Sequence, residues 1–244
     1  MEDSFENLED DDELGELPPV DLVEVAPLPE LYETADPFVL AGLPEFEPVV
    51  VIQPEPPKEE SKEKTSGKAT EFFGTRSYGS DFVFVIDCSS SMSVKYRWRR
   101  AVRELVATLD QLDSEQKFLV LLYNDKNYMM FGAPNSQRLI WATDENKRLI
   151  RNWLGEATPF SGTRPGKSVR LALKKNPDAI YFLSDGELRD NTMFDLRHWN
   201  APKEGPDGLR RKIPIHTVLL GSNFGLETMR TIAEENNGIF TKVQ

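Results

Sequence analysis

The sequence predicts an α/β fold, a doubly wound sheet with helices on both faces, preceded by an acidic tail. Two observations predict this fold. Between residues 80 and 244, short apolar runs alternate with helical patterns, and continuous apolar runs are typical of parallel strands that are buried on both faces. Two of these runs end in an aspartate, Asp87 and Asp185, and ligands of such folds bind at the carboxyl ends of the strands.

Six segments have the length and composition of strands. We predict strands at residues 82–87, 117–123, 128–131, 179–184, 213–220 and 239–243. Most of them are continuous apolar runs without the polar alternation of a half-exposed strand, so we expect both sides of the sheet to be covered.

Helical patterns separate the strands, at residues 98–112, 143–154, from 165 onward, 192–199 and 225–236. In the first pattern, apolar residues between Trp98 and Leu112 recur every three or four positions. Thr143 is a favoured N-cap residue, Pro165 stands at a favoured first-turn position, and Gly238 follows the last helix as a stop signal.

Oxygen-bearing side chains occur in three loops of this predicted sheet. The first strand runs into Asp87-Cys88-Ser89-Ser90-Ser91, the turn Ser161-Gly162-Thr163 precedes a helical pattern, and the fourth strand ends in Asp185-Gly186. Because crossovers between parallel strands are right-handed, all three loops should lie on one rim. Carboxylate and hydroxyl oxygens suit Mg²⁺ or Mn²⁺, with Ca²⁺ less favoured, and do not suit zinc. The candidate metal ligands are Asp87, Ser89, Ser91, Thr163 and Asp185.

Each loop also has an ordinary explanation. Asp and Ser are favoured at helix N-caps, and Gly-containing turns are common. Three such coincidences would have to occur in the right order, so we interpret the set as a metal site, one that is either used or empty in the protein's function.

The order and spacing of these motifs resemble the von Willebrand factor type A family over residues 80–244. They fit that family's metal-ion-dependent adhesion site, and the stretch from Glu71-Phe72-Phe73-Gly74 onward resembles its bacterial branch. The resemblance implies direct metal contact for Ser89, Ser91 and Thr163, and contact mainly through water for Asp87 and Asp185. It also implies an antiparallel edge strand, for which Tyr128–Phe131 is the candidate, and hence a six-stranded, mostly parallel sheet.

One departure from the family concerns the C-terminal side. Some members carry a switching helix after the last strand, whereas this sequence ends at Gln244, directly after residues 239–243. We therefore do not carry over the integrin-like helix movement. Phe72 and Phe73 could cover the apolar face instead, or belong to an ordinary lead-in segment.

Charge divides the chain into two parts. Residues 1–70 contain 20 Asp and Glu, four Lys and no Arg, a net charge of −16, while 21 acidic and 25 basic residues follow, a net charge of +4. Ten of the 17 prolines also lie in residues 1–70. This composition predicts a disordered tail, with the von Willebrand factor A-like domain at 71–244.

The sequence also limits where the protein acts and which bonds it forms. The single cysteine, Cys88, cannot form an intramolecular disulfide. The N-terminus lacks the pattern of a signal peptide, and no apolar run approaches the roughly 20 residues of a membrane span. We expect a cytoplasmic protein, although the chain could be the soluble part of a longer, anchored one.

The motifs of several enzyme classes are incomplete, so we do not predict an enzyme. Phosphatases of the haloacid dehalogenase type resemble the first strand, but they need a second aspartate where this chain has Ser89. The dinucleotide and P-loop glycine patterns are absent, because the segment from Gly162 to Ser168 has the wrong spacing. The two histidines, His198 and His216, stand outside any recognisable triad motif.

The predicted function is metal-dependent protein binding, in which a Mg²⁺ or Mn²⁺ ion captures a Glu or Asp carboxylate of a partner. The alternative is a structural scaffold with an unused metal site, in which the acidic tail carries the binding. The tail could also contact the site in cis or in trans. A basic patch from Lys95 to Arg103 could steer such acidic ligands, and we do not predict nucleic-acid binding.

Overall fold

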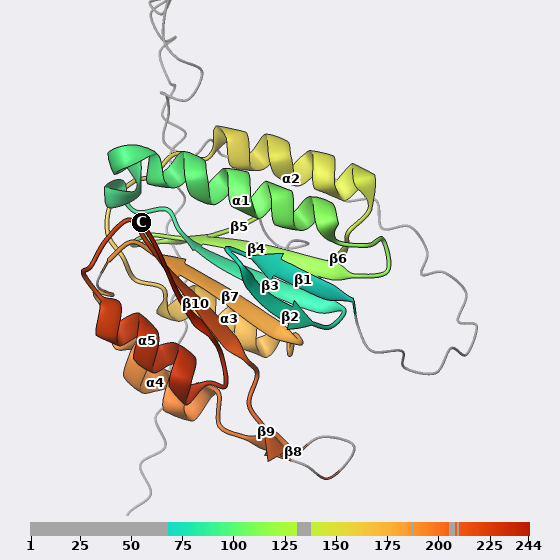
Figure 1. Cartoon of the computed structure of the whole chain (residues 1–244), viewed down its shortest axis with the longest axis vertical. Helices are drawn as coiled ribbons and strands as arrows, with labels where there is room; N and C mark the ends of the chain where they lie inside the picture. The colour runs from blue at the N-terminus through green and yellow to red at the C-terminus, as the bar shows by residue number, and fades with distance from the viewer. Residues whose placement is uncertain (1–67, 131–137, 187, 205–207, 209) are drawn as a thin grey trace, which may run out of the picture. The chain divides into compact units, whose positions relative to one another are not determined.

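The computed structural model describes residues 68–130, 138–186, 188–204, 208 and 210–244 (Figure 1). The acidic tail predicted at 1–70 lies outside the described residues, except for residues 68–70.

A seven-stranded sheet forms the centre of the described domain. Six of its strands lie in the order β11–β10–β7–β3–β4–β5, parallel except at β5, and β6 pairs antiparallel with the start of β4. The predicted doubly wound, mostly parallel sheet is thus confirmed, with the two-residue β6 as an addition. The strands are β3 (Asp81–Asp87), β4 (Lys117–Tyr123), β5 (Asn127–Met129), β6 (Ile140–Trp141), β7 (Ala179–Ser184), β10 (Ile215–Leu220) and β11 (Phe240–Val243).

Helices cover both faces of this sheet, as the sequence predicts (Figure 1). On one face lie α1 (Arg97–Gln111) and α2 (Asp144–Glu156), which pack against each other. The other face carries α3 (Gly166–Lys174), α4 (Thr192–Trp199) and α5 (Leu226–Glu235). The bounds differ from the predicted ones by one or two residues, and Thr143 caps α2 by accepting a hydrogen bond from the Asn146 N–H group.

The strand order reverses direction beside β3. From β3 the chain crosses to β4 on one side, and it later returns to β7 on the other side. Right-handed crossovers in opposite directions place helices on opposite faces, and they leave a crevice where the carboxyl ends of the two strands diverge. Asp87 ends β3 and Asp185 follows β7, so the fold brings both aspartates to this crevice.

An antiparallel hairpin, β1 (Ala69–Phe72) and β2 (Thr75–Tyr78), precedes the sheet and was not predicted. Phe72 is fully buried, and its ring meets those of Phe84 and Tyr181 edge to face, with centroids 5.6 Å apart in both pairs. At the far end, the Thr75 hydroxyl lies 2.6 Å from that of Thr241 on β11. The hairpin therefore covers the sheet from β3 to β11 beside α1, which confirms the covering role for Phe72.

Smaller elements also differ from the predictions. A 3₁₀ segment, η1 (Ser90–Tyr96), separates β3 from α1, and a two-residue pair, β8 (Lys203–Glu204) with β9 (Arg210–Arg211), follows α4. The predicted edge strand 128–131 corresponds to β5, and its last residue lies outside the described residues. Among the helices of the described part, none is both long and apolar enough to cross a bilayer.

We expect Phe72→Ala to lower the free energy of unfolding by about 3–5 kcal/mol, the usual cost of truncating a fully buried Phe. Urea unfolding followed by circular dichroism measures this cost. Phe73→Ala is the matched control, because Phe73 is only partly buried, and it should cost less than half as much. Equal costs would contradict the anchoring role of Phe72.

Candidate metal centre

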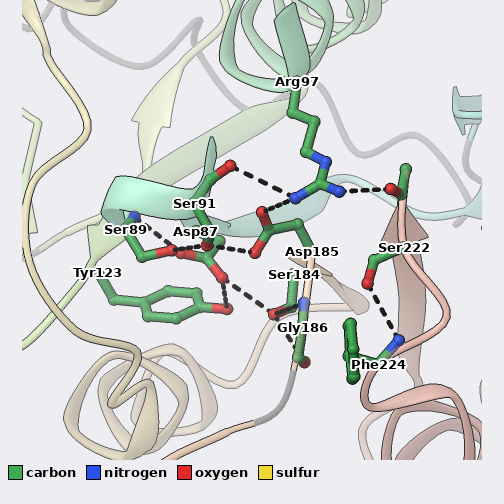
Figure 2. Close-up of polar contacts among 11 residues, drawn as sticks. Asp87, Ser89, Ser91, Arg97, Tyr123, Ser184, Asp185, Gly186, Ser222 and Phe224 are labelled. Atoms are coloured by element: carbon green, nitrogen blue, oxygen red, sulfur yellow. Dashed lines mark hydrogen bonds and ion pairs between the residues drawn. The ribbon is translucent and has the colours of Figure 1, made fainter. Parts of the chain in front are cut away.

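Asp87, the last residue of β3, is fully buried. Its Oδ1 accepts a hydrogen bond from the Ser89 N–H group at 2.8 Å, and its Oδ2 accepts from the hydroxyls of Ser184 at 2.9 Å and Tyr123 at 3.3 Å (Figure 2). Ser184 belongs to β7 and Tyr123 to β4, the two strands that flank β3. These neutral donors orient the carboxylate but leave its charge uncompensated.

Hydrogen bonds link the two serines of the first loop to Asp185. The Ser89 and Ser91 hydroxyl oxygens lie 3.0 Å apart, and the Ser91 hydroxyl donates to Asp185 Oδ1 at 2.8 Å. Adjacent ligands of an octahedral Mg²⁺ ion with bonds near 2.1 Å lie about 3.0 Å apart. The Ser89 and Ser91 hydroxyls therefore have the spacing of neighbouring ligands around one small cation, and the Asp185 carboxylate lies within hydrogen-bond distance of Ser91.

Thr163 reaches the same place from another loop. It is nearly buried, 8% exposed, and lines one cleft together with Ser91 and Asp185. A backbone hydrogen bond of 3.1 Å from the Ser90 N–H group to the Ser161 carbonyl joins this loop to the one after β3. The structure thus brings all five predicted ligands to one rim of the sheet.

Asp125 holds the Thr163 loop in place, a role that the sequence analysis missed. Its carboxylate accepts hydrogen bonds from the Ser161 hydroxyl at 2.5 Å and the Gly162 N–H group at 3.2 Å. The bond from Ser161 is the main reason why the pKa of Asp125 lies below its ordinary value. A Cβ atom at residue 162 would lie 1.7 Å from Asp125 Oδ1, so any side chain there would displace the Asp125 carboxylate from this position.

Arg97, the first residue of α1, also belongs to the centre (Figure 2). Its guanidinium donates to Asp185 Oδ2 at 2.7 Å, to the Ser91 carbonyl at 3.4 Å and to the Gly221 carbonyl at 2.5 Å. The Arg97 side chain is 15% exposed and that of Asp185 2% exposed. One of the two buried carboxylates is therefore paired with a cation of the chain itself.

Unusual backbone conformations on both sides of Arg97 accompany its contacts with Asp185 and Gly221. Lys95 and Tyr96, directly before it, have φ angles of 53° and 59°, a conformation that costs non-glycine residues about 1–2 kcal/mol each. On the other side, Gly221 has φ 64°, and a Cβ atom there would lie 2.9 Å from Arg97 Nε. Strained residues often mark functional sites, so we count Arg97 as part of the candidate centre.

A cleft of about 980 Å³ opens beside the centre. The loops after β3, β7 and β10 and the end of β11 form its walls. Its charged side chains are Asp185 and five cations, Lys95, Arg97, Arg100, Arg189 and Lys242, of which Arg97 pairs with Asp185 and Arg100 donates to the Gln244 carbonyl. An anion approaching this rim therefore meets an excess of positive charge.

The residues present fit a hard divalent cation. Burial is the main cause that raises the pKa of Asp87 to about 6, and the nearby Asp185 charge and the Ser89 and Ser184 hydrogen bonds modify it further. Two carboxylates close together with one counter-charge are relieved by a cation. Within the described part of the chain, no three His, Cys, Asp or Glu side chains gather around one point, so a metal here would depend on the hydroxyls of Ser89, Ser91 and Thr163. Hydroxyl and carboxylate oxygens are ligands typical of Mg²⁺ and Mn²⁺.

The family model of the von Willebrand factor type A domain matches residues 80–241. The chain belongs to this family. Proteins of the family serve in adhesion and in protein–protein interaction, and the match covers every residue of the candidate centre and the sheet as far as the second residue of β11. No curated protein matches the chain.

Solved structures of bacterial proteins share the von Willebrand factor type A fold. A von Willebrand factor type A protein from Catenulispora acidiphila is 18% identical, with a TM-score of 0.56, over 70% of this chain and 40% of its own. The conserved hypothetical protein BatB from Bacteroides thetaiotaomicron is 16% identical, with a TM-score of 0.52, over 68% and 91%. An aerotolerance-related membrane protein from Bacteroides fragilis is 17% identical, with a TM-score of 0.50, over 68% and 92%. The chain thus spans less than half of the first protein and most of the other two.

We expect the stability of the metal-free protein to depend on pH through Asp87. The folded state holds the Asp87 proton more tightly than the unfolded state, because its pKa is about 6 instead of its usual value near 4. The free energy of unfolding should therefore fall as pH rises from about 4 to 6, by on the order of 3 kcal/mol, and stay low above pH 6.

Urea unfolding in chelator at pH 4–8, compared with Asp87→Asn, measures this contribution. Asparagine has the same shape and can accept the Ser89 bond, but it does not titrate. The difference between the two proteins should therefore change across that window. A difference independent of pH would contradict the elevated pKa of Asp87.

Arg97→Gln should destabilise the metal-free protein by about 3 kcal/mol, because it leaves the buried Asp185 carboxylate without its cation. Chemical denaturation in chelator measures the change. Arg103→Gln, an exposed position on the same helix, is the control and should cost less than about 0.5 kcal/mol. Equal effects of the two changes would argue against the Arg97–Asp185 pair.

Proposed function

We propose that this von Willebrand factor type A domain binds an acidic protein partner through a Mg²⁺ or Mn²⁺ ion. The observation that supports this most directly is the approach of the Ser89 and Ser91 hydroxyl oxygens to 3.0 Å, with Thr163 lining the same cleft as Ser91. Ser89, Ser91 and Thr163 would be direct ligands, with Asp87 and Asp185 acting mainly through water. When bound, the metal would supply a Lewis-acidic position for a partner's carboxylate.

The charge of the centre favours an anionic ligand. Asp87 and Asp185 bring two negative charges and Arg97 one positive charge, so a dication leaves the centre with one formal positive charge. Hydroxyl ligands do not reduce that charge. A carboxylate of the partner would neutralise it, and the cationic walls of the cleft would attract the partner beforehand.

Exposed apolar side chains near the centre favour a protein as the partner. Val94, Tyr96, Phe160 and Phe224 are between 50% and 73% exposed. They lie in the loops that also carry the candidate ligands or line the cleft. Aromatic residues are enriched in protein interfaces, and a site that held only an ion would not need them.

The competing functions have less support. Neither histidine lines the cleft, and the one carboxylate in its lining, that of Asp185, is paired with Arg97, so we propose a binding domain and not an enzyme. A scaffold with an unused site would not need exposed apolar side chains around the centre, such as those of Tyr96, Phe160 and Phe224.

Titration calorimetry of the full chain with Mg²⁺ and with Mn²⁺ tests the proposal. We expect one site per chain, and Ser91→Ala should weaken it at least tenfold, because the change removes one direct ligand. Ser90→Ala is the matched control: it deletes the same hydroxyl group one residue away, from an exposed side chain, and should leave the affinity unchanged. Equal affinities of the two variants, or no binding of either metal at millimolar concentration, would refute the proposal.

A further inference from the structure

The cleft beside the candidate metal centre has more positive charge than a single partner carboxylate would neutralise. Asp185 is the one acidic side chain among the described residues that line it, and Arg97 already pairs with Asp185. Four further cations lie in the lining, Lys95, Arg100, Arg189 and Lys242, of which Arg100 also donates a hydrogen bond to the Gln244 carbonyl. They come from four separate parts of the chain: η1, α1, the loop after β7 and β11. A ligand with several negative charges would therefore fit this cleft better than a single carboxylate.

The same cleft also has an apolar contact. Phe224 lines it and is 71% exposed, and Tyr96, next to the lining residue Lys95, is 73% exposed. A ligand that carried only negative charges would leave these rings in water. The cleft is thus complementary to a peptide segment in which carboxylates alternate with apolar side chains.

The chain itself contains such a segment. Residues 1–16 hold nine Asp and Glu and no Lys or Arg, with Phe5, Leu8 and Leu14 among them. We propose that the cleft binds this N-terminal segment of the same chain, through its four cations outside the Arg97–Asp185 pair and through Phe224. The inference shares the partner chemistry of the proposed function, but it does not require the metal.

The connection between segment and cleft is long enough. The Lys68 carbonyl accepts hydrogen bonds from the Gly79 N–H group and the Gln116 side chain, at the edge of the sheet where β3 begins. The cleft lies where β3 ends, about 23 Å away along the seven residues of the strand. The 51 residues from 17 to 67 can span at most about 170 Å, so the connection imposes no limit. Covalent attachment would then give the segment an effective concentration in the millimolar range.

A consequence for partner binding follows. The segment and an external acidic partner would use the same cations, so they would compete. An external partner would have to contact the metal as well in order to displace a segment that is held by charge and one aromatic ring.

Zero-length carbodiimide cross-linking of the full chain, mapped by mass spectrometry, tests the proposal. The reagent joins a carboxylate to a lysine only where the two are in contact. Lys95 and Lys242 report on the cleft, and Lys174 and Lys203, both exposed elsewhere, serve as reference lysines. We expect at least fivefold more links from residues 2–16 to the cleft lysines than to the reference lysines, and loss of this excess at 1 M salt.

A charge-matched pair of variants sharpens the test. Arg100→Gln with Arg189→Gln removes two cleft cations without touching a candidate ligand or a reporting lysine, and should reduce the links to Lys95 and Lys242 at least threefold. Arg148→Gln with Arg151→Gln removes the same charge from the exposed side of α2 and should leave them unchanged.

Two further measurements test whether the links form within one molecule and whether they depend on the metal. In a mixture of isotope-labelled and unlabelled chains, the links should join residues of the same molecule, and links mainly between molecules would overturn the proposal. An even distribution over all four lysines would overturn it too. Each sample is measured in chelator and in Mg²⁺: an excess of links at the cleft in chelator supports the inference even if calorimetry finds no metal site. A metal site without this excess supports only the proposed function.

Discussion

The parallel pairing of β3 with β7 is the constraint on which the rest of the site depends. It brings Asp87 and Asp185, each at or just beyond the end of its strand, to one crevice that excludes most water. Two carboxylates in such a place disfavour each other's ionised form, and burial adds to that cost. Two kinds of contact offset this cost. Neutral hydrogen-bond donors surround Asp87, and the Arg97 guanidinium forms an ion pair with Asp185.

The two carboxylates of the centre therefore differ in how far their negative charge is compensated. Arg97 already compensates the charge of Asp185 through a hydrogen bond to Oδ2, while Asp185 Oδ1 accepts a hydrogen bond from the Ser91 hydroxyl. Asp87 has no such partner among the described residues, so most of the attraction for a cation comes from its side. This asymmetry allows the centre to keep its shape without a metal and leaves the Asp87 charge for the proposed cation to compensate.

The sequence was enough to predict the sheet, the helices and the rim on which the five candidate ligands meet. Continuous apolar strands and the Asp87 and Asp185 positions carry that information, because strand order and crossover handedness leave few alternatives. The hairpin with Phe72 was not predicted, since two four-residue strands with mixed polarity leave little pattern to detect. Its packing on Phe84 and Tyr181 is a long-range contact that no local signal encodes.

The role of Arg97 could not be read from the sequence either, because it depends on the backbone. Within the basic run from Lys95 to Arg103, the residue types do not show which side chain turns inward. Lys95 and Tyr96 adopt left-handed conformations, and because neither residue is glycine, the sequence does not indicate this turn. Asp125 likewise follows β4 as an ordinary polar loop residue, and its hydrogen bonds from Ser161 and Gly162 are long-range contacts that the sequence does not reveal.

The close approach of Arg97 to Gly221 has a consequence for evolution. Because any side chain at residue 221 would collide with the guanidinium, the two positions are expected to change together in related proteins. Homologues that keep an arginine at the first position of the helix after the Asp-x-Ser-x-Ser loop should also keep glycine after the strand that corresponds to β10. Homologues that lose one should be released from the need for the other. This pair of residues offers a criterion for separating, within a large and divergent family, the branch that carries its own cation beside the candidate metal site.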